Sequence, residues 1–227
     1  MVLTGVVGVW AARRHPGRWT ARAALGLALL IFAAWAGEYI ADVILGIWSI
    51  KYDLPLQLTD AVSLVSVAAL WSFARGTRRR LMVELVYFWA LSASLQAVLT
   101  PDLAYDFPSV FYFTYFVYHI GAVLAAVVFV FGLRLYPRPG AVKRVYALSL
   151  AWTALAAIGD LATGGNYMYL RFKPVHGSLL NVMGRWPWYI AETMVLALAL
   201  LLALWAIARG VQRLDRRRGD VTADALA

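Results

Sequence analysis

The stretch of sequence that decides the fold is PSVFYFTYFVYHIGAVLAAVVFVFGL, residues 108–133. It contains no Asp, Glu, Lys or Arg, and it is longer than the roughly 20 apolar residues that a helix needs to cross a bilayer. We therefore predict a membrane-spanning helix. One histidine, His119, lies near its middle, where its side chain is far from either aqueous interface.

Five more segments share this apolar character: Ala21–Trp48, Leu56–Ala74, Leu81–Leu99, Val142–Leu161 and Trp186–Ala208. A further stretch, Val2–Ala12, is too short to span, so we expect the inner half of a helix or an interfacial segment there. Hydrophobic residues make up 63% of the chain and charged residues only 15%, which excludes an ordinary soluble domain. The sequence predicts an all-α, polytopic membrane helix bundle of six full transmembrane helices plus an N-terminal partial helix.

Positive charge alternates between the connections of these segments. The basic connections are residues 13–22, 75–80 and 134–144, together with the tail after Arg209. Residues 49–55, 101–107 and 163–185 carry little positive charge. By the positive-inside rule the first set is cytoplasmic and the second external. We therefore expect a multi-pass protein of the cell membrane with a cytoplasmic C-terminus.

Residues 1–227 are predicted to form a single transmembrane domain. Within it we expect a partial helix and basic loop at 1–20, an ordered external loop at 163–187, and a cytoplasmic, disordered tail at 210–227. The chain has no cysteine, which excludes disulfides, thiolate nucleophiles and Cys-ligated metals. Topogenic Lys and Arg account for the net charge of +9, so we expect no nucleic-acid partner; we also expect no cofactor.

Seven polar residues fall within the apolar segments, where a charge is costly: Glu38, Asp42, Thr59, Asp60, His119, Asp160 and Glu192. With a rise of about 1.5 Å per residue, the predicted topology puts all seven in the outer half of the bilayer. This convergence predicts one site. Four of the carboxylates also lie close enough to the interface to snorkel or to cap a helix: Glu38, Asp42, Asp60 and Asp160.

His119 and Thr59 are the candidates for catalysis. A neutral imidazole in a low dielectric is a good general base, because burial disfavours its cation. Thr59 offers a hydroxyl, which becomes nucleophilic only beside a base. Asp60 follows directly and points about 100° away on a helix, so we do not expect it to share the same contact with His119. A core histidine bonded to a backbone carbonyl is the structural alternative.

Other polar residues are candidates for binding substrate or for donating to an oxyanion: Gln57, Asp60, Gln96, Asn166, Tyr167, Lys173 and Arg185. The last four belong to a loop, from Gly164 to Tyr189, that is rich in turn formers and interfacial aromatics. The loop is either an ordered aromatic cap on the headgroups, or a lid whose Arg171, Lys173 and Arg185 meet a lipid phosphate.

A set of strings occurs in order along the chain: LPLQLTD (54–60), ELVYFW (84–89), LQAVLTPDL (95–103), FPSVFYF (107–113), GGNYMYL (164–170), SLLN (178–181) and GRWPWY (184–189). With these strings the chain resembles the YwaF-type bacterial membrane proteins, which are related to eukaryotic transmembrane protein 164. The resemblance extends over nearly the whole of residues 54–189.

The eukaryotic relative is described as an acyltransferase that builds polyunsaturated ether phospholipids with a cysteine and a histidine inside the membrane. The resemblance puts Thr59 at the position of that cysteine and His119 at that of the histidine. Because this chain has no cysteine, the thioester route is closed. A more distant similarity to the androgen-induced hydrolases of fatty-acid esters, which are said to use a threonine and a histidine, implies an acyl-enzyme on Thr59.

We therefore expect an intramembrane lipid acyltransferase or acyl-ester hydrolase, with Thr59 as nucleophile and His119 as base. Its substrate would be a membrane phospholipid or fatty-acyl ester entering from the outer leaflet. The alternative is a transporter, channel or lipid-binding protein that uses the acidic cavity, although no inverted repeat is visible. A metal site made of His119 and two carboxylates, or a purely structural protein, also remains open.

Overall fold

The computed structural model describes residues 2–14, 17–103, 105–175 and 177–224, and all regular structure in these residues is helical. The elements in chain order are α1 (Val2–Arg14), α2 (Arg18–Ile44), α3 (Leu58–Ala74), α4 (Arg80–Trp89), η1 (Ala90–Ser94), α5 (Leu95–Leu99), α6 (Val110–Val127), η2 (Val128–Gly132), α7 (Ala141–Thr163), η3 (Tyr167–Tyr169), η4 (Leu179–Val182) and α8 (Trp188–Asp224). The segments η1 and η2 are π-helical turns that continue α4 and α6, whereas η3 and η4 are short 3-10 turns.

Five helices are long and apolar enough to cross a membrane: Arg18–Ile44, Arg80–Leu99, Val110–Gly132, Ala141–Thr163 and Trp188–Arg217. These helices make the chain an integral, multi-pass membrane protein. The sixth predicted span, α3, is apolar but has only 17 residues. At 1.5 Å per residue it is about 25 Å long, which is less than the hydrocarbon thickness of about 30 Å.

Small residues allow the helices α2, α3 and α6 to pack closely. The buried face of α2 consists of Ala24, Ala28, Ile31 and Ala34. Gly121 of α6 faces it, and a Cβ added at this glycine would lie 2.6 Å from Cγ1 of Ile31. Lipid is as apolar as the side chains, so close packing rather than the hydrophobic effect holds such helices together.

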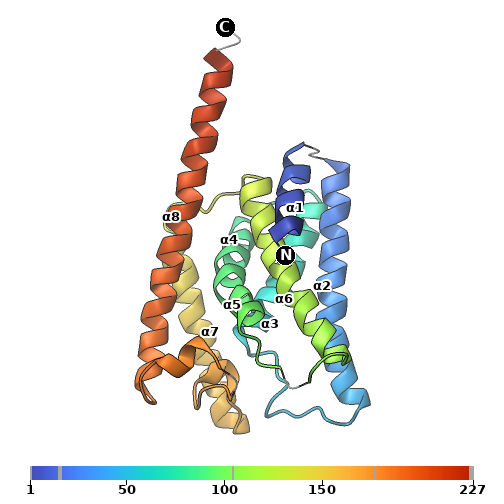
Figure 1. Cartoon of the computed structure of the whole chain (residues 1–227), viewed down its shortest axis with the longest axis vertical. Coiled ribbons are helices and arrows are strands. Elements are labelled where there is room, and N and C mark those ends of the chain that lie inside the picture. The colour runs from blue at the N-terminus through green and yellow to red at the C-terminus, as the bar shows by residue number, and fades with distance from the viewer. Residues whose placement is uncertain (1, 15–16, 104, 176, 225–227) are drawn as a thin grey trace.

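The N-terminal helix α1 covers only part of the bundle. It has 13 residues and packs against η2 and α6 (Figure 1). Gly132 of η2 and Ala12 of α1 meet there, because a Cβ added at Gly132 would lie 3.0 Å from the Ala12 Cβ. The helix therefore lines the end of the bundle that carries the basic connections.

The helices α7 and α8 lie side by side on one flank of the bundle formed by α1 to α6 (Figure 1). Few of their residues are buried, so most of their surface is left to face lipid. The α8 helix is also longer than expected. Instead of the disordered tail predicted from residue 210, helix continues to Asp224, and residues 225–227 lie outside the described part.

Ion pairs hold the basic end of the bundle together. Glu84 of α4 is 2% exposed and pairs with Arg138 at 2.9 Å and with Arg144 at 3.0 Å. This carboxylate also accepts a hydrogen bond from the Arg138 backbone N–H, and the ion pair raises the pKa of the Arg138 guanidinium. Glu84 therefore fastens the α6–α7 connection to α4.

Candidate functional site

Asp60, in the first turn of α3, carries a buried carboxylate, at 6% exposed. Its Oδ1 accepts a hydrogen bond from Nε1 of Trp35 on α2, at 3.0 Å. Its Oδ2 accepts from the backbone N–H of Gln57 at 3.2 Å, so Asp60 also caps the start of α3. Tyr39 is within hydrogen-bonding reach of the same carboxylate. Asp60 thus joins α2 to α3.

Glu38 lies beside this group on α2. Its Oε2 accepts a hydrogen bond from the hydroxyl of Thr114 on α6, at 3.3 Å. Tyr118, one turn further along α6, also reaches Glu38, and Asp60 is close enough to both side chains to interact with them electrostatically. The structure therefore brings two of the predicted acids together, between α2, α3 and α6.

The start of α3 lies beside α6. Tyr118 is about 12 Å along α6 from its first residue, at 1.5 Å per residue. Asp60, in the first turn of α3, is close enough to Tyr118 to interact with it electrostatically. Thr59 precedes Asp60 in this turn, and His119 follows Tyr118 on α6.

His119 is 2% exposed and lies against two tyrosine rings on its own helix, Tyr115 and Tyr118, at centroid distances of 4.2 and 4.3 Å. Its Nδ1 is 2.7 Å from the backbone oxygen of Tyr115. Because a carbonyl oxygen only accepts, Nδ1 carries the proton and donates it. In the neutral ring Nε2 then holds the lone pair, which is the form that a general base requires.

Thr59 begins a stripe of hydroxyl groups on one face of α3. Ser63 and Ser66 follow at helical spacing and are 1% and 0% exposed. The Ser63 hydroxyl donates to the Thr59 backbone oxygen, whereas the Ser66 hydroxyl has no hydrogen-bond partner among the described residues. The hydroxyl of buried Ser94 in η1 also has no hydrogen-bond partner among the described residues. Because α3, η1 and α6 contact one another, these buried serines and His119 belong to the same bundle interior.

The loop predicted to be external, residues 163–187, is attached to the start of α3. The backbone N–H of Met168 donates to Oε1 of Gln57 at 2.8 Å. Tyr167 is 1% exposed; its hydroxyl donates to the Ile50 backbone oxygen at 2.7 Å and accepts from the Leu54 N–H at 3.0 Å. Burial raises the pKa of Tyr167, so it remains a hydroxyl donor. These bonds satisfy the non-helical backbone that leads into α3.

Asp160 organises the same loop from the end of α7. It is 2% exposed, and its Oδ1 accepts the Tyr167 backbone N–H at 2.6 Å, while its Oδ2 has no partner among the described residues. Asn166 is occupied within the loop: its side chain accepts from the N–H groups of Arg171 and Phe172 and donates to the Phe172 oxygen. Asp160 and Asn166 therefore position the loop.

The remaining predicted site residues lie outside the buried group. Gln96 donates to the Thr100 hydroxyl at 2.6 Å, and Lys173 donates to the Met183 backbone oxygen at 2.8 Å. Glu192 is exposed on α8 and accepts the Gly184 N–H at 2.9 Å. Arg185 is exposed, and Asp42 lies half-buried at the outer end of α2. The described residues contain no group of three His, Cys, Asp or Glu able to hold a metal.

Sequence reasoning missed the neutral partners of the acids, namely Trp35, Tyr39, Thr114 and Tyr118. In the sequence these are ordinary members of apolar segments. One signal was present, because Trp35 and Tyr39 are one turn apart from each other, and Glu38 adjoins Tyr39. The ring centroids of Trp35 and Tyr39 lie 4.7 Å apart, so the two rings form one aromatic wall beside Asp60.

An apolar cavity of about 150 Å³ lies next to this region. It is bounded by α4, α7, α8 and the external loop, and Leu58 closes it on the side of α3. Tyr169 and Tyr189 stand at its loop end, joined by a hydrogen bond from the Tyr189 hydroxyl to the Tyr169 backbone oxygen. Leu58 immediately precedes Thr59 in the first turn of α3, whereas the side chains of Thr59 and His119 do not line the cavity.

Residues 1–206 match the model of the TMEM164 family, which covers every helix except the end of α8. The chain belongs to the TMEM164 family. This confirms the resemblance to transmembrane protein 164 inferred from the sequence strings. No curated protein and no solved structure matches the chain. For this TMEM164-family protein, the group formed by Thr59, Asp60 and His119 with their neighbours is the candidate site.

Proposed function

We propose that this TMEM164-family protein transfers or hydrolyses fatty-acyl groups of lipids inside the membrane, with Thr59 as nucleophile and His119 as general base. The observation that carries the proposal is the hydrogen bond from His119 Nδ1 to the Tyr115 oxygen. It leaves the basic nitrogen of a buried imidazole on the other edge of the ring.

The proposed reaction has two steps. His119 Nε2 takes the proton of the Thr59 hydroxyl as its oxygen attacks the ester carbonyl carbon of the lipid. The tetrahedral intermediate then breaks the bond to the leaving alcohol, which receives the proton from the imidazolium, and an acyl-threonine remains. In the second step water or a lipid hydroxyl gives its proton to His119 and attacks the acyl-threonine. The acyl group leaves as an acid or a new ester, and the imidazolium returns its proton to the Thr59 oxygen, which regenerates the hydroxyl.

Among the predicted oxyanion donors, Gln57 fits best. Its Oε1 is engaged by the Met168 N–H, so its NH₂ group is the end left to donate. The NH₂ group of Gln96 already donates to Thr100, and that of Asn166 donates to the Phe172 oxygen. The acyl chain would occupy the cavity bounded by α4, α7 and α8, whose lining is largely apolar and which ends at Leu58.

The topology proposed from the charge pattern suits this reaction. It gives six membrane-crossing helices, with α3 as the shortest, and a partial helix α1 on the cytoplasmic side. The C-terminus would be cytoplasmic, and Thr59 and His119 would lie in the outer half. A lipid of the outer leaflet would then reach Thr59 from the α7–α8 flank, below the external loop.

Lipid profiling of cells that express variants tests the proposal. We expect Thr59→Ala and His119→Gln to abolish the change in phospholipid acyl composition that the wild type causes, because each removes one member of the pair. Thr59→Ser keeps the hydroxyl and should retain activity. Thr163→Ala, at the outer end of α7, is the matched control. If Thr59→Ala and His119→Gln both turn over the same lipids as wild type, the proposal is wrong.

Thr59→Cys adds a test that few proteins allow, because the chain has no other cysteine. We expect this variant to form a thioester with substrate, so that hydroxylamine at neutral pH releases the acyl group. A thiol-reactive lipid analogue should inactivate Thr59→Cys and leave the wild type unaffected. Labelling of Thr59→Cys that does not depend on His119 would argue against the pairing.

A further inference from the structure

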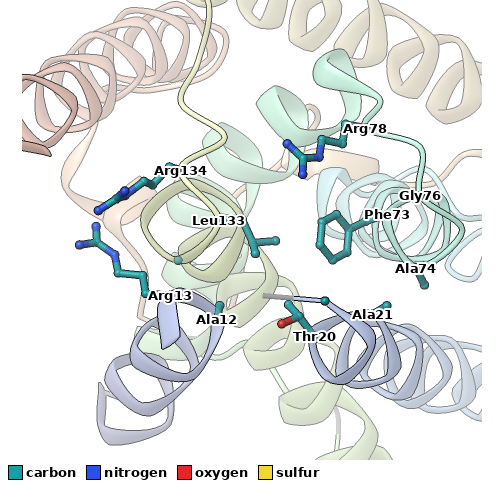
Figure 2. A pocket seen from close by; sticks show the side chains of 12 residues that line it. Ala12, Arg13, Thr20, Ala21, Phe73, Ala74, Gly76, Arg78, Leu133 and Arg134 are labelled. Carbon is teal, nitrogen blue, oxygen red and sulfur yellow. The ribbon is translucent and has the colours of Figure 1, made fainter. Parts of the chain in front are cut away.

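A second and larger cavity, of about 440 Å³, lies at the basic end of the bundle, away from the first turn of α3. Figure 2 shows the side chains around it. Four segments line it: the end of α1, the start of α2, the end of α3 with the residues that follow, and the end of η2. Three arginines from distant parts of the sequence, Arg13, Arg78 and Arg134, meet at this one cavity.

Two of these arginines, Arg13 and Arg134, share one carboxylate, Asp215 of α8. Arg13 and Arg134 each lie 3.1 Å from its Oδ2. Arg78 is exposed, and no ion pair or hydrogen bond of its side chain is found among the described residues. Three guanidinium groups and one carboxylate leave a net charge of 3 − 1 = +2 at the cavity. An anion placed between Arg78 and Arg134 would be attracted from both sides.

The backbone of the cavity wall is unusual at two places. Arg134 has a φ of +55°, a left-handed conformation that ordinarily selects glycine or asparagine. Gly76 has a φ of +83°, and an added Cβ would have no atom within 4 Å, so its backbone faces open space. An arginine is thus held where glycine is favoured, and glycine leaves room for a ligand to approach.

The floor of the cavity is apolar, formed by Ala12, Ala21, Phe73 and Leu133. A basic rim above an apolar floor matches a molecule with both a phosphate and a hydrocarbon part. Membrane insertion alone requires positive charge near the surface, but it does not require three arginines to converge on one hollow.

We propose that this cavity binds a phosphate group, held chiefly by Arg78 and Arg134. The phosphate would come from an anionic phospholipid of the adjacent leaflet or from free phosphate in solution. The inference is independent of the proposed reaction, because the cavity contains neither Thr59 nor His119.

Binding to the purified full-length protein in a zwitterionic detergent tests this site. The probes are short-chain phosphatidic acid and, separately, inorganic phosphate, titrated by calorimetry at low salt. We expect saturable binding to the wild type and about tenfold weaker binding to Arg78→Ala, because one charge-assisted contact is lost. Arg80→Ala removes the same charge two residues away, outside the cavity, and should change affinity less than twofold.

The two probes distinguish the sources of the phosphate. Affinity for phosphatidic acid at least tenfold above that for inorganic phosphate supports a lipid ligand that also uses the floor. Equal affinities, both weakened by Arg78→Ala, support free phosphate. Arg78 has no partner to lose on mutation, so the melting temperature should be unchanged. If neither probe binds saturably, or if Arg78→Ala and Arg80→Ala behave alike, the proposal is overturned.

Discussion

A carboxylate inside a membrane bundle needs hydrogen-bond donors, and Asp60 and Glu84 obtain them in different ways. Glu84 receives two guanidinium groups and a backbone N–H. Asp60 receives an indole N–H and a backbone N–H, and has no ion-pair partner among the described residues. Glu84 is therefore a structural clamp. Asp60 is held by neutral donors and joins α2 to α3 without an ion pair among the described residues.

The Glu84 clamp gives a prediction for stability. Glu84→Gln should destabilise the protein by about 1–3 kcal/mol, because Arg138 and Arg144 lose a charged acceptor. Unfolding by heat or denaturant in detergent measures the change. Glu192→Gln is the matched control, since this exposed carboxylate accepts only the Gly184 N–H, and its effect should be smaller. Equal losses of stability for the two variants would contradict the role of Glu84.

Hydropathy predicts that Asp60 and His119 lie inside the membrane, because both interrupt long apolar segments, and both side chains are buried in the bundle. Their partners could not be predicted in the same way. Trp35 and Tyr39 contact Asp60 only because α2 is rotated to bring that face against α3, and such a rotation depends on packing between helices. The bond from His119 to the Tyr115 oxygen corresponds to the structural alternative foreseen for this histidine, and it is equally compatible with a general base.

Among the elements, the connection from α2 to α3 depends most on a single side chain. Tyr167 supplies both a donor and an acceptor to this non-helical segment. Inside a membrane such backbone is tolerated only where protein satisfies it. Hydrogen bonds from Tyr167 therefore hold the external loop and the α2–α3 connection together as one unit next to the start of α3.

Tyr167→Phe should weaken the attachment of the external loop to the α2–α3 connection. Loss of two hydrogen bonds at a buried site costs about 1–2 kcal/mol, so we expect roughly tenfold faster amide hydrogen exchange in residues 49–57. Exchange mass spectrometry measures the difference. Tyr105→Phe, which removes a hydroxyl from an exposed tyrosine near the same end, should leave exchange in these residues unchanged. Unchanged exchange in Tyr167→Phe would refute the anchoring role.

The contact between α2 and α6 gives a second prediction at this scale. Gly121→Val should destabilise the bundle by about 1–3 kcal/mol, because the new side chain overlaps Ile31. Ile31→Ala should restore part of the loss in the double variant. Gly26→Val on α2 is the control, since an added Cβ there has no atom within 4 Å. A Gly121→Val protein as stable as Gly26→Val would show that the two helices do not pack closely.

At the scale of the whole molecule, composition alone predicted an all-helical membrane protein, because apolar length and charge are properties of the sequence. The residues at which individual helices begin and end were harder to predict, as the start of α3 and the end of α8 show. The sequence of α3 reads as a span from Leu56, but capping by Asp60 starts the helix at Leu58. The basic tail reads as disordered, yet the ties of Asp215 to Arg13 and Arg134 hold this part of α8 against the bundle.

The absence of cysteine allows the topology to be measured directly. Val175→Cys, exposed in the external loop, should react with a membrane-impermeant maleimide on intact cells. Thr77→Cys, in the basic connection after α3, should react only after the membrane is permeabilised. The unmodified chain gives no background signal. The reverse pattern would invert the proposed orientation and place Thr59 in the inner leaflet.

The α8 helix contacts the rest of the bundle through a few polar bonds and a few buried side chains. The Tyr87 hydroxyl donates to its Leu204 oxygen at 2.8 Å, and Tyr189 and Asp215 make further contacts toward its two ends. Leu201 and Ala208 are its residues in the apolar core. A hydrogen bond in a membrane interior contributes only about 1 kcal/mol. We therefore expect α8 to be the helix that separates most easily from the bundle. Because α8 forms one wall of the apolar cavity, its separation would open that cavity sideways to the bilayer.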